Sequence, residues 1–246
     1  CGQHCLKDMD SHPPKELALD HILERANPFD AFICHNAKSF MDLPEGAVVG
    51  TSSLRRQAFL LEKRPDLKIE PLRGNVQTRL DKLAAGQVDA TFLAIAGLER
   101  MGIKGDFIHP VSQGDMIPAC GQGTLCIETR VGDEWTRNIV DCIHHTETGL
   151  ITAAERAVLA NLDGSCRTPI GAYATLNGHM MTCRAVLAAP DGSEIYAARA
   201  VAQVLTLAQG HDLGILVAEE LRAKAGADAL GRLACDYHHS NQSQHA

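Results

Sequence analysis

Five arginines follow three expected strands, and each lies close to a point where a helix begins. They are Arg55, Arg56, Arg73, Arg79 and Arg100. A guanidinium offers a planar fork of N–H donors that a carboxylate or a phosphate accepts, so the pattern is typical of an anion site. Arg55 and Arg56 stand in the first turn of an expected helix, where positive charge opposes the helix dipole unless an anion lies in front of it. The sequence therefore predicts that these arginines face a negatively charged ligand.

The elements that position these arginines are three strands expected at 47–49, 67–72 and 91–96. The first strand leads into the loop 50–53 and a helix, and the second leads into 73–75 and another helix. If the strands are parallel, their carboxyl ends meet at one edge of the sheet, where open α/β sheets bind ligands. We therefore expect the five guanidiniums to converge on one crevice.

Apolar spacing predicts which faces of these two helices are buried. The inward positions are Leu54, Ala58 and Leu61 in the first helix and Val76, Leu80 and Leu83 in the second. Gly86 is expected to end the second helix.

The composition of the whole chain restricts the kind of ligand. With 246 residues, it is long enough for two or three domains, each with its own core. The 23 basic and 30 acidic side chains give a net charge of -7, which argues against a general nucleic-acid binder. The arginine cluster is a local exception on an acidic protein and favours a small polyanionic ligand. No apolar run approaches the roughly 20 residues needed to span a bilayer, so no membrane partner is expected.

Nine cysteines are scattered along the chain without a close pair such as CxxC. This argues against a zinc ribbon and against a secreted disulfide scaffold, and most of the thiols are expected to be small buried groups in a reducing compartment. Cys166 differs because it lies in a polar Gly-Ser loop. His144 and His145 with Glu147 are interpreted as a water-exposed helix entrance, and no metal site is expected.

The rest of the chain predicts two further regions. Residues 4–8 are interpreted as the end of a strand whose beginning is missing, and further strands are expected at 30–34 and 124–129. Residues 135–145 look helical, and Thr146 or Thr148 is expected to cap the next helix.

Two hairpin signals, Asn177-Gly178 and Asp191-Gly192, predict a three-stranded antiparallel sheet near the C-terminus. Its strands are expected at 170–176, 180–187 and 195–202. A closing helix from Asp212 to about Lys224 should cover the sheet, and a polar, frayed tail is expected at 237–246. The inward positions of the helix are Leu213, Leu216, Val217 and Leu221.

Four motifs in consistent order carry a family resemblance. They are HCLKD at 4–8, GTSSLRRQ at 50–57, LRGNVQTRL at 72–80 and GSCRTPIGA at 164–172. Together they resemble hydroxymethylbilane synthase, also called porphobilinogen deaminase. The resemblance implies periplasmic-binding-protein-like α/β lobes, the first of them N-terminally incomplete here, and a C-terminal α+β domain with a three-stranded antiparallel sheet. The expected divisions are 1–28 with 118–143 for the first domain, 29–117 for the arginine-rich second domain and 144–246 for the third.

The resemblance also implies the reaction and the residues that serve it. The family polymerises porphobilinogen head to tail, with loss of ammonia, on a dipyrromethane cofactor held by a cysteine thioether. Asp8 matches the catalytic carboxylate, Lys7 its basic neighbour and Cys166 the attachment cysteine. The residues implied to hold the cofactor are Thr51, Ser52, Ser53, Arg55, Arg56, Arg73 and Gly74, and those implied to bind substrate are Arg79, Arg100 and Gln122. Hinges are expected at 26–28 and near 117–118, because one site must accept successive rings.

One function of a different class remains open from the residues alone. Paired α/β lobes with helix-terminus anion sites also serve non-catalytic solute-binding proteins. Such a binder needs the arginines but neither Asp8 nor Cys166, so these two residues discriminate between the hypotheses. For the enzyme we expect a monomer in the cytoplasm, with organellar import left open because the chain opens at Cys1 rather than Met.

Overall fold

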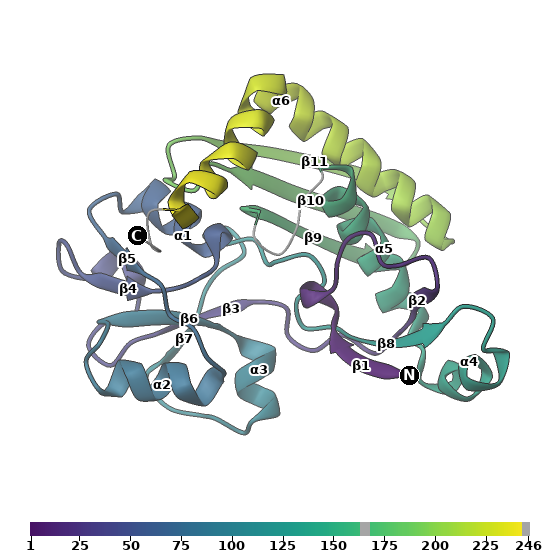
Figure 1. Ribbon diagram of the computed structural model, residues 1–246, viewed down its shortest axis with the longest axis horizontal. Helices are drawn as coiled ribbons and strands as arrows, with labels where there is room; N and C mark the ends of the chain where they lie inside the picture. Colours follow the sequence, from purple (N-terminus) through teal and green to yellow (C-terminus); the bar gives the residue numbers. More distant parts are fainter. Residues whose placement is uncertain (163–167, 243–246) are drawn as a thin grey trace.

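The chain folds around three β-sheets. The computed structural model describes residues 1–162 and 168–242, with side chains described up to residue 226 (Figure 1). The sheets have the strand orders β1-β8-β2, β5-β4-β6-β3-β7 and β11-β10-β9. The predicted fold class is confirmed, because an α/β lobe is followed by a domain with a three-stranded antiparallel sheet. No helix in the described part of the chain has both the length and the hydrophobicity to cross a membrane.

The five-stranded sheet carries the arginine-bearing junctions. β4 (Val48–Gly50) is parallel both to β5 (Lys68–Glu70) and to β6 (Ala90–Ala94), so the condition for convergence at one edge of the sheet is met. β3 (Asp30–Ile33) runs antiparallel to β6 on one side and to β7 (Ile108–Pro110) on the other. The start of β3 therefore lies at the same edge as the carboxyl ends of the parallel strands.

Three helices follow these strands. α1 (Leu54–Lys63) begins after its N-cap Ser53, and α2 (Val76–Ala84) begins after its N-cap Asn75. α3 (Ile95–Arg100) starts before the predicted end of the third strand, because that strand stops at Ala94. α2 and α3 cover one face of the sheet and α1 lies on the other (Figure 1). Arg100 accordingly lies in the last turn of a helix.

The predicted inner face of α1 is only partly correct. Ala58 is buried as expected, but Leu54 and Leu61 are partly exposed, while the helix also buries Phe59 and Leu60. The helix is rotated because Arg55 and Arg56 point inward, to a carboxylate described below. In α2, Leu83 is buried and Val76 and Leu80 pack against the same core cluster, so that prediction is confirmed. Gly86 follows α2 with a φ of 69°, as expected of a helix stop.

The first sheet contains the strand predicted near residue 4, but this strand ends at Cys5 and not at residue 8. β8 (Leu125–Arg130) lies between β1 (Gly2–Cys5) and β2 (Leu17–Ile22) and is antiparallel to both. A 3-10 helix, Leu6–Asp8, follows β1 directly and carries Lys7 and Asp8. Leu6 is fully buried, and this anchors the turn that presents its two polar neighbours.

Two helical segments connect this sheet to the third domain. α4 (Glu134–Val140) continues into a 3-10 helix, Asp141–Ile143, so the helical stretch ends slightly earlier than predicted. α5 (Thr146–Asn161) is capped by the ring of His145, which accepts the N–H of Thr148. The expectation that a threonine caps this helix is therefore wrong.

The third sheet has the predicted antiparallel order, with β10 (Met180–Ala188) between β9 (Ile170–Asn177) and β11 (Ile195–Gln203). Gly178 and Gly192 take φ values of 58° and 75° in the two connecting turns, which explains glycine at both positions.

Helices α5 and α6 (Leu207–Gln242) pack against the third sheet (Figure 1). α6 starts earlier than predicted, and its backbone stays helical to Gln242 apart from Gly226, so the frayed tail expected from residue 237 is wrong as far as residue 242. Leu213, Val217 and Leu221 are buried as expected, but Leu216 is 55% exposed, because it lies on the side of the helix turned away from the sheet.

The third sheet also contacts the arginine-bearing lobe. A Cβ at Gly192 would lie 2.3 Å from the backbone nitrogen of Glu62 in α1, so the turn between β10 and β11 sits tightly on that helix. The side chain of Gln57 donates a 3.0 Å hydrogen bond to the carbonyl of Pro190 in the same turn.

A buried ion pair joins the first sheet to the third domain. Glu155 in α5 is fully buried and accepts from both terminal nitrogens of Arg25, at 2.6 and 3.1 Å. It also accepts the backbone N–H of Gly121 at 2.7 Å and of Ala174 at 2.9 Å. One carboxylate therefore ties together the segment after β2, the crossover loop and the third sheet.

Replacing Arg25 with alanine should destabilise the protein by about 3 to 5 kcal/mol, because the Glu155 carboxylate would stay buried without its charge partner. Urea unfolding followed by circular dichroism measures the change. Arg130→Ala is the control, since the Arg130 side chain is 80% exposed and its ion pair with Asp133 spans 3.7 Å. Equal stability of the two variants would contradict the role given to the buried pair.

Candidate active site

A cavity of about 300 Å³ lies between the first sheet and the arginine-bearing lobe. Its described charged lining consists of one carboxylate and four cationic side chains, namely Asp8, Lys7, Arg56, Arg79 and Arg100. The backbone of the junctions after β5, β6 and the crossover contributes Gly74, Gly97 and Gly123. The surplus of positive charge makes the cavity suited to a ligand that carries several carboxylates.

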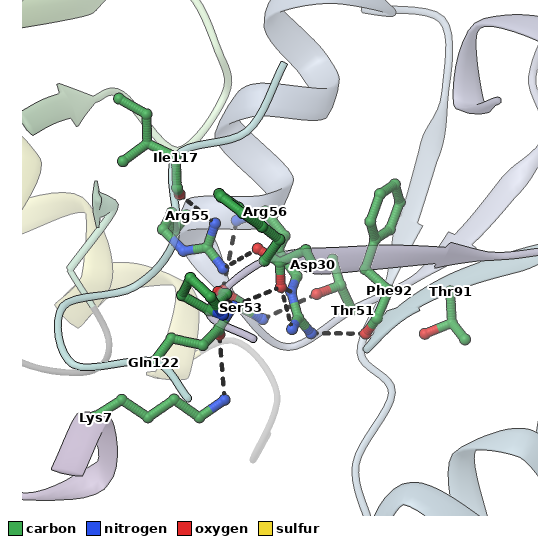
Figure 2. Close-up of polar contacts among 12 residues, drawn as sticks. Lys7, Asp30, Thr51, Ser53, Arg55, Arg56, Thr91, Phe92, Ile117 and Gln122 are labelled. Atoms are coloured by element: carbon green, nitrogen blue, oxygen red, sulfur yellow. Dashed lines mark hydrogen bonds and ion pairs between the residues drawn. The ribbon is translucent and has the colours of Figure 1, made fainter. Parts of the chain in front are cut away.

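Arg55 and Arg56 share a buried carboxylate, that of Asp30 (Figure 2). The Oδ1 atom of Asp30 accepts from Nε and Nη2 of Arg56 at 3.0 and 2.6 Å. Its Oδ2 atom accepts from Nη2 of Arg55 at 2.8 Å. Asp30 is 1% exposed. The anion expected in front of the arginine pair is therefore supplied by the chain itself.

Backbone carbonyls take further donors of the same pair. Nη1 of Arg55 donates to the carbonyl of Ile117, and Nη1 of Arg56 donates to that of Phe92, both at 2.6 Å. Nε of Arg55 is buried and has no hydrogen-bond partner among the described residues. Both guanidiniums are thus held from several sides, which gives them a fixed orientation.

In the loop that precedes these arginines, two hydroxyl oxygens accept hydrogen bonds from backbone N–H groups of the loop and of the first helical turn. Oγ of Ser53 accepts the N–H of Arg56 at 3.4 Å, and Oγ1 of Thr51 accepts the N–H of Ser53 at 3.1 Å. Thr51 is buried and Ser52 is exposed. Among the three residues expected to contact the cofactor, Thr51 and Ser53 therefore position Arg55 and Arg56 in this structure.

Crowded positive charge shifts the pKa values around the cavity. Burial alone would raise the pKa of Asp30, but the guanidiniums of Arg55 and Arg56 outweigh it and hold that pKa well below 3.8. The pKa of Lys7 is lowered by burial and then by the charge of Arg56. Burial and Arg56 also lower the pKa of Arg79. These cationic groups repel one another, so an anionic ligand would relieve their repulsion.

Family models match most of the chain. Residues 2–138 match "Porphobilinogen deaminase, dipyromethane cofactor binding domain", and residues 150–223 match "Porphobilinogen deaminase, C-terminal domain". The chain belongs to the porphobilinogen deaminase family. The predicted family and cofactor class are thereby confirmed, and the cationic lining of the cavity fits a dipyrromethane whose pyrroles carry carboxylate side chains.

The solved structures to which parts of this chain are similar are distant. A YaeC-family lipoprotein from Enterococcus faecalis V583 is 18% identical, with 54% of this chain and 64% of that chain covered and a TM-score of 0.35. A Salmonella typhimurium periplasmic binding protein with high arginine specificity is 10% identical, with 51% and 55% covered and a TM-score of 0.32. YhfZ from Shigella flexneri is 17% identical, with 57% and 62% covered and a TM-score of 0.28. The chain thus spans less than two thirds of each of these structures.

The cavity of this porphobilinogen deaminase family member brings together six of the thirteen predicted site residues, five of them charged. Arg56, Arg79 and Arg100 line the cavity with Lys7 and Asp8, whereas Arg55 and Arg73 are not among its described lining residues. Arg55 lies behind Arg56 on the same carboxylate, and Arg73 is exposed. Convergence of all five arginines on one crevice is therefore only partly correct.

Gly74 and Gln122 have positioning contacts. Gly74 has a φ of 119°, a value that favours glycine, and its carbonyl accepts Nε of Arg79 at 2.9 Å. Gln122 is 1% exposed and accepts from Nζ of Lys7 at 3.3 Å. Its Nε2 donates to the carbonyl of Pro28 at 2.7 Å, so this side chain joins the two crossover segments as expected of a crossover residue.

The thiols differ in their access to the cavity. Cys166 lies outside the described residues. Cys34, Cys120, Cys126 and Cys183 are buried among the seven cysteines whose side chains are described, and burial raises the pKa of Cys120 to about 12 and that of Cys126 to about 11. Cys5 lines the cavity.

Two residues near the site have no functional role that the sequence predicts. The sequence pattern predicts only a strand end at Cys5 and only the start of an apolar strand at Asp30. An acidic residue at the head of the otherwise apolar strand Asp30–Ile33 was the available signal. Only the antiparallel direction of β3, which the sequence does not predict, places Asp30 at the edge of the sheet where the arginines lie.

Replacing Arg79 with glutamine should weaken the binding of benzene-1,2,4,5-tetracarboxylate, a simple polycarboxylate probe, by about tenfold. The reason is the loss of a charge-assisted hydrogen bond, which contributes about 1.5 to 3 kcal/mol. Titration calorimetry at low salt measures the affinity, and higher salt should weaken binding to the unmodified protein. Lys68→Gln makes the same charge change on an exposed residue of β5 and should leave the affinity unchanged. An equal loss of affinity in both variants would show that the probe does not bind in the cavity that Arg79 lines.

Proposed function

We propose that this chain is a transferase that polymerises porphobilinogen head to tail, with release of ammonia, into the linear tetrapyrrole hydroxymethylbilane on a covalently bound dipyrromethane primer. The observation that carries the proposal is the cavity in which one carboxylate, Asp8, stands among four cationic side chains. Membership of the porphobilinogen deaminase family supports it.

The cationic side chains serve as the binding part of the site. Each porphobilinogen carries an acetate and a propionate, so a growing oligopyrrole is a row of carboxylates. Arg79 and Arg100 would bind the carboxylates of the incoming substrate, and Arg55 and Arg56 would hold those of the primer. Thr51, Ser52, Ser53, Arg73, Gly74 and Gln122 remain assigned to the same ligands by family resemblance.

Asp8 serves as the chemical part of the site. When ammonia leaves the aminomethyl group of porphobilinogen, an electrophilic methylene-pyrrole remains. The free α-carbon of the neighbouring ring forms the new carbon–carbon bond to it and then loses its proton. Asp8 is exposed and lines the cavity, where its carboxylate can stabilise the cationic pyrroles and accept that proton. The ammonium group of Lys7 beside it partly compensates the negative charge of Asp8.

Cys166 serves as the attachment point of the primer. A dipyrromethane bound there through a thioether supplies the terminal ring to which the first substrate unit is joined. We further propose that the protein acts as a monomer in the cytoplasm, with neither a nucleic acid nor a membrane as partner.

Asp8→Asn should reduce the rate of porphobilinogen consumption by about 10²-fold or more, since proton transfer by a positioned side chain contributes about 10²- to 10⁴-fold. Ammonia release and the colour reaction of pyrroles with Ehrlich's reagent both measure turnover. Asp10→Asn, two residues away and exposed, is the matched control and should keep the normal rate. Tight tetracarboxylate binding without any turnover by the unmodified chain would instead favour a non-catalytic binding module.

Intact-mass spectrometry should show an added mass of two linked pyrroles on the protein after incubation with porphobilinogen. Cys166→Ser should abolish this addition, because serine lacks a thiolate that can capture the reactive methylene. Cys5→Ser is the control, since Cys5 is the described thiol that lines the cavity, and it should keep the addition. Loss of the added mass in Cys5→Ser but not in Cys166→Ser would show that the primer is attached to Cys5 and would contradict the assignment to Cys166.

A further inference from the structure

We infer that Asp30 is a positioning residue of this site, which fixes the guanidiniums of Arg55 and Arg56 and, through Gln122, the ammonium group of Lys7. The cationic wall of the cavity would then keep its shape before any ligand binds. The catalytic side of this inference rests on the proposed function, whereas its binding side stands without it.

The place of Asp30 in the fold explains how it can act without touching substrate. It is the first residue of β3, and it pairs across the antiparallel ladder with Ala94, a residue that lines the cavity. Asp30 itself is 1% exposed and is not among the described lining residues. Its influence on a ligand therefore passes through the side chains bonded to it.

The hydrogen bonds of Asp30 require a carboxylate rather than an amide. Its two oxygens accept from the two guanidiniums and also from Nε2 of Gln122, at 3.3 Å for the last contact (Figure 2). An ionised carboxylate only accepts, whereas asparagine would replace one oxygen by an NH₂ group. That group would meet the donors of Arg55 or Arg56, so the substitution both removes the charge and breaks the fork geometry.

Asp30 also sets the direction of the Gln122 side chain. Because Asp30 and the carbonyl of Pro28 both accept, Nε2 of Gln122 must face them, and this leaves Oε1 to accept Nζ of Lys7. An amide at position 30 could accept from or donate to Gln122, so the orientation would no longer be fixed. Lys7 would then lose its assured acceptor, because the Gln122 amide is the group that connects Lys7 to Asp30.

Arg56 can bind a ligand without leaving Asp30. Each terminal nitrogen of a guanidinium carries two hydrogens. After Arg56 donates to Asp30 and to the carbonyl of Phe92, one N–H remains on each terminal nitrogen. Asp30 therefore does not have to be displaced by a ligand carboxylate, and it offsets one of the two adjacent positive charges when no ligand is present.

A purely structural ion pair is the competing explanation, and Asp30→Asn distinguishes the two. In folded protein, this variant should bind benzene-1,2,4,5-tetracarboxylate at least about tenfold more weakly and should raise the KM for porphobilinogen by a similar factor. The matched control is Asp66→Asn, because Asp66 accepts two 2.7 Å bonds from Arg64 in the same lobe without lining the cavity. The control should leave affinity and KM unchanged.

A double-mutant cycle tests whether Asp30 acts through Arg56. In an Arg56→Gln background, Asp30→Asn should weaken tetracarboxylate binding by less than about twofold more, since the side chain through which it acts is gone. The full tenfold loss in that background, or normal affinity and KM in folded Asp30→Asn, would overturn the inference. If the unmodified chain binds the probe but does not consume porphobilinogen, the proposed function fails while the binding measurements still decide the role of Asp30.

If the Asp30→Asn variant does not fold, Asp30→Glu provides a second test of the positioning role. Glutamate retains the charge that compensates the guanidiniums but moves the carboxylate by one methylene group. We expect a normal unfolding midpoint with at least about threefold weaker probe binding. An affinity equal to that of the unmodified protein would contradict a positioning role.

Discussion

The structure depends on one electrostatic constraint, the burial of two adjacent guanidiniums in the first turn of a helix. Arg55 and Arg56 are 4% and 5% exposed, so their charges must be compensated inside the protein. Asp30 provides the charge, and the carbonyls of Ile117 and Phe92 take further donors. The compensation is partial, since one carboxylate faces two guanidiniums. The remaining positive charge, together with that of the neighbouring cavity residues, is what makes the site attractive to polycarboxylates.

A second buried carboxylate, that of Glu155, has a different role from that of Asp30. Glu155 binds Arg25 and two backbone N–H groups and so holds the first sheet, the crossover and the third domain together. Asp30 and Gln122 instead connect the same crossover to the functional side chains. Nε of Arg25 donates to the carbonyl of Gln122, which brings the two networks into contact. Domain arrangement and the shape of the cavity are therefore linked at residues 118–122 and 25–30.

Periodicity and turn chemistry predicted much of this fold, because those signals are local. The presence of the three strands after which the arginines lie and the buried face of α2 followed from spacing, and the hairpins at Gly178 and Gly192 followed from turn chemistry. The rotation of α1 could not be predicted in that way, since it depends on where Asp30 lies after β3 pairs antiparallel with β6. The motifs predicted Lys7, Asp8, Arg56, Arg79 and Arg100 together, but spacing could not tell that Arg55 would lie behind the cavity wall or that Cys5 would line it.

The central claim is that Arg55 and Arg56 stay bonded to Asp30 while the free N–H groups of Arg56 receive a ligand carboxylate. A crystal structure of the chain with benzene-1,2,4,5-tetracarboxylate bound tests this most directly. The account predicts a carboxylate within hydrogen-bond distance of Arg56 and Arg79, with the Asp30 contacts retained. Guanidiniums that have swung away from Asp30, or a probe bound outside this cavity, would contradict it.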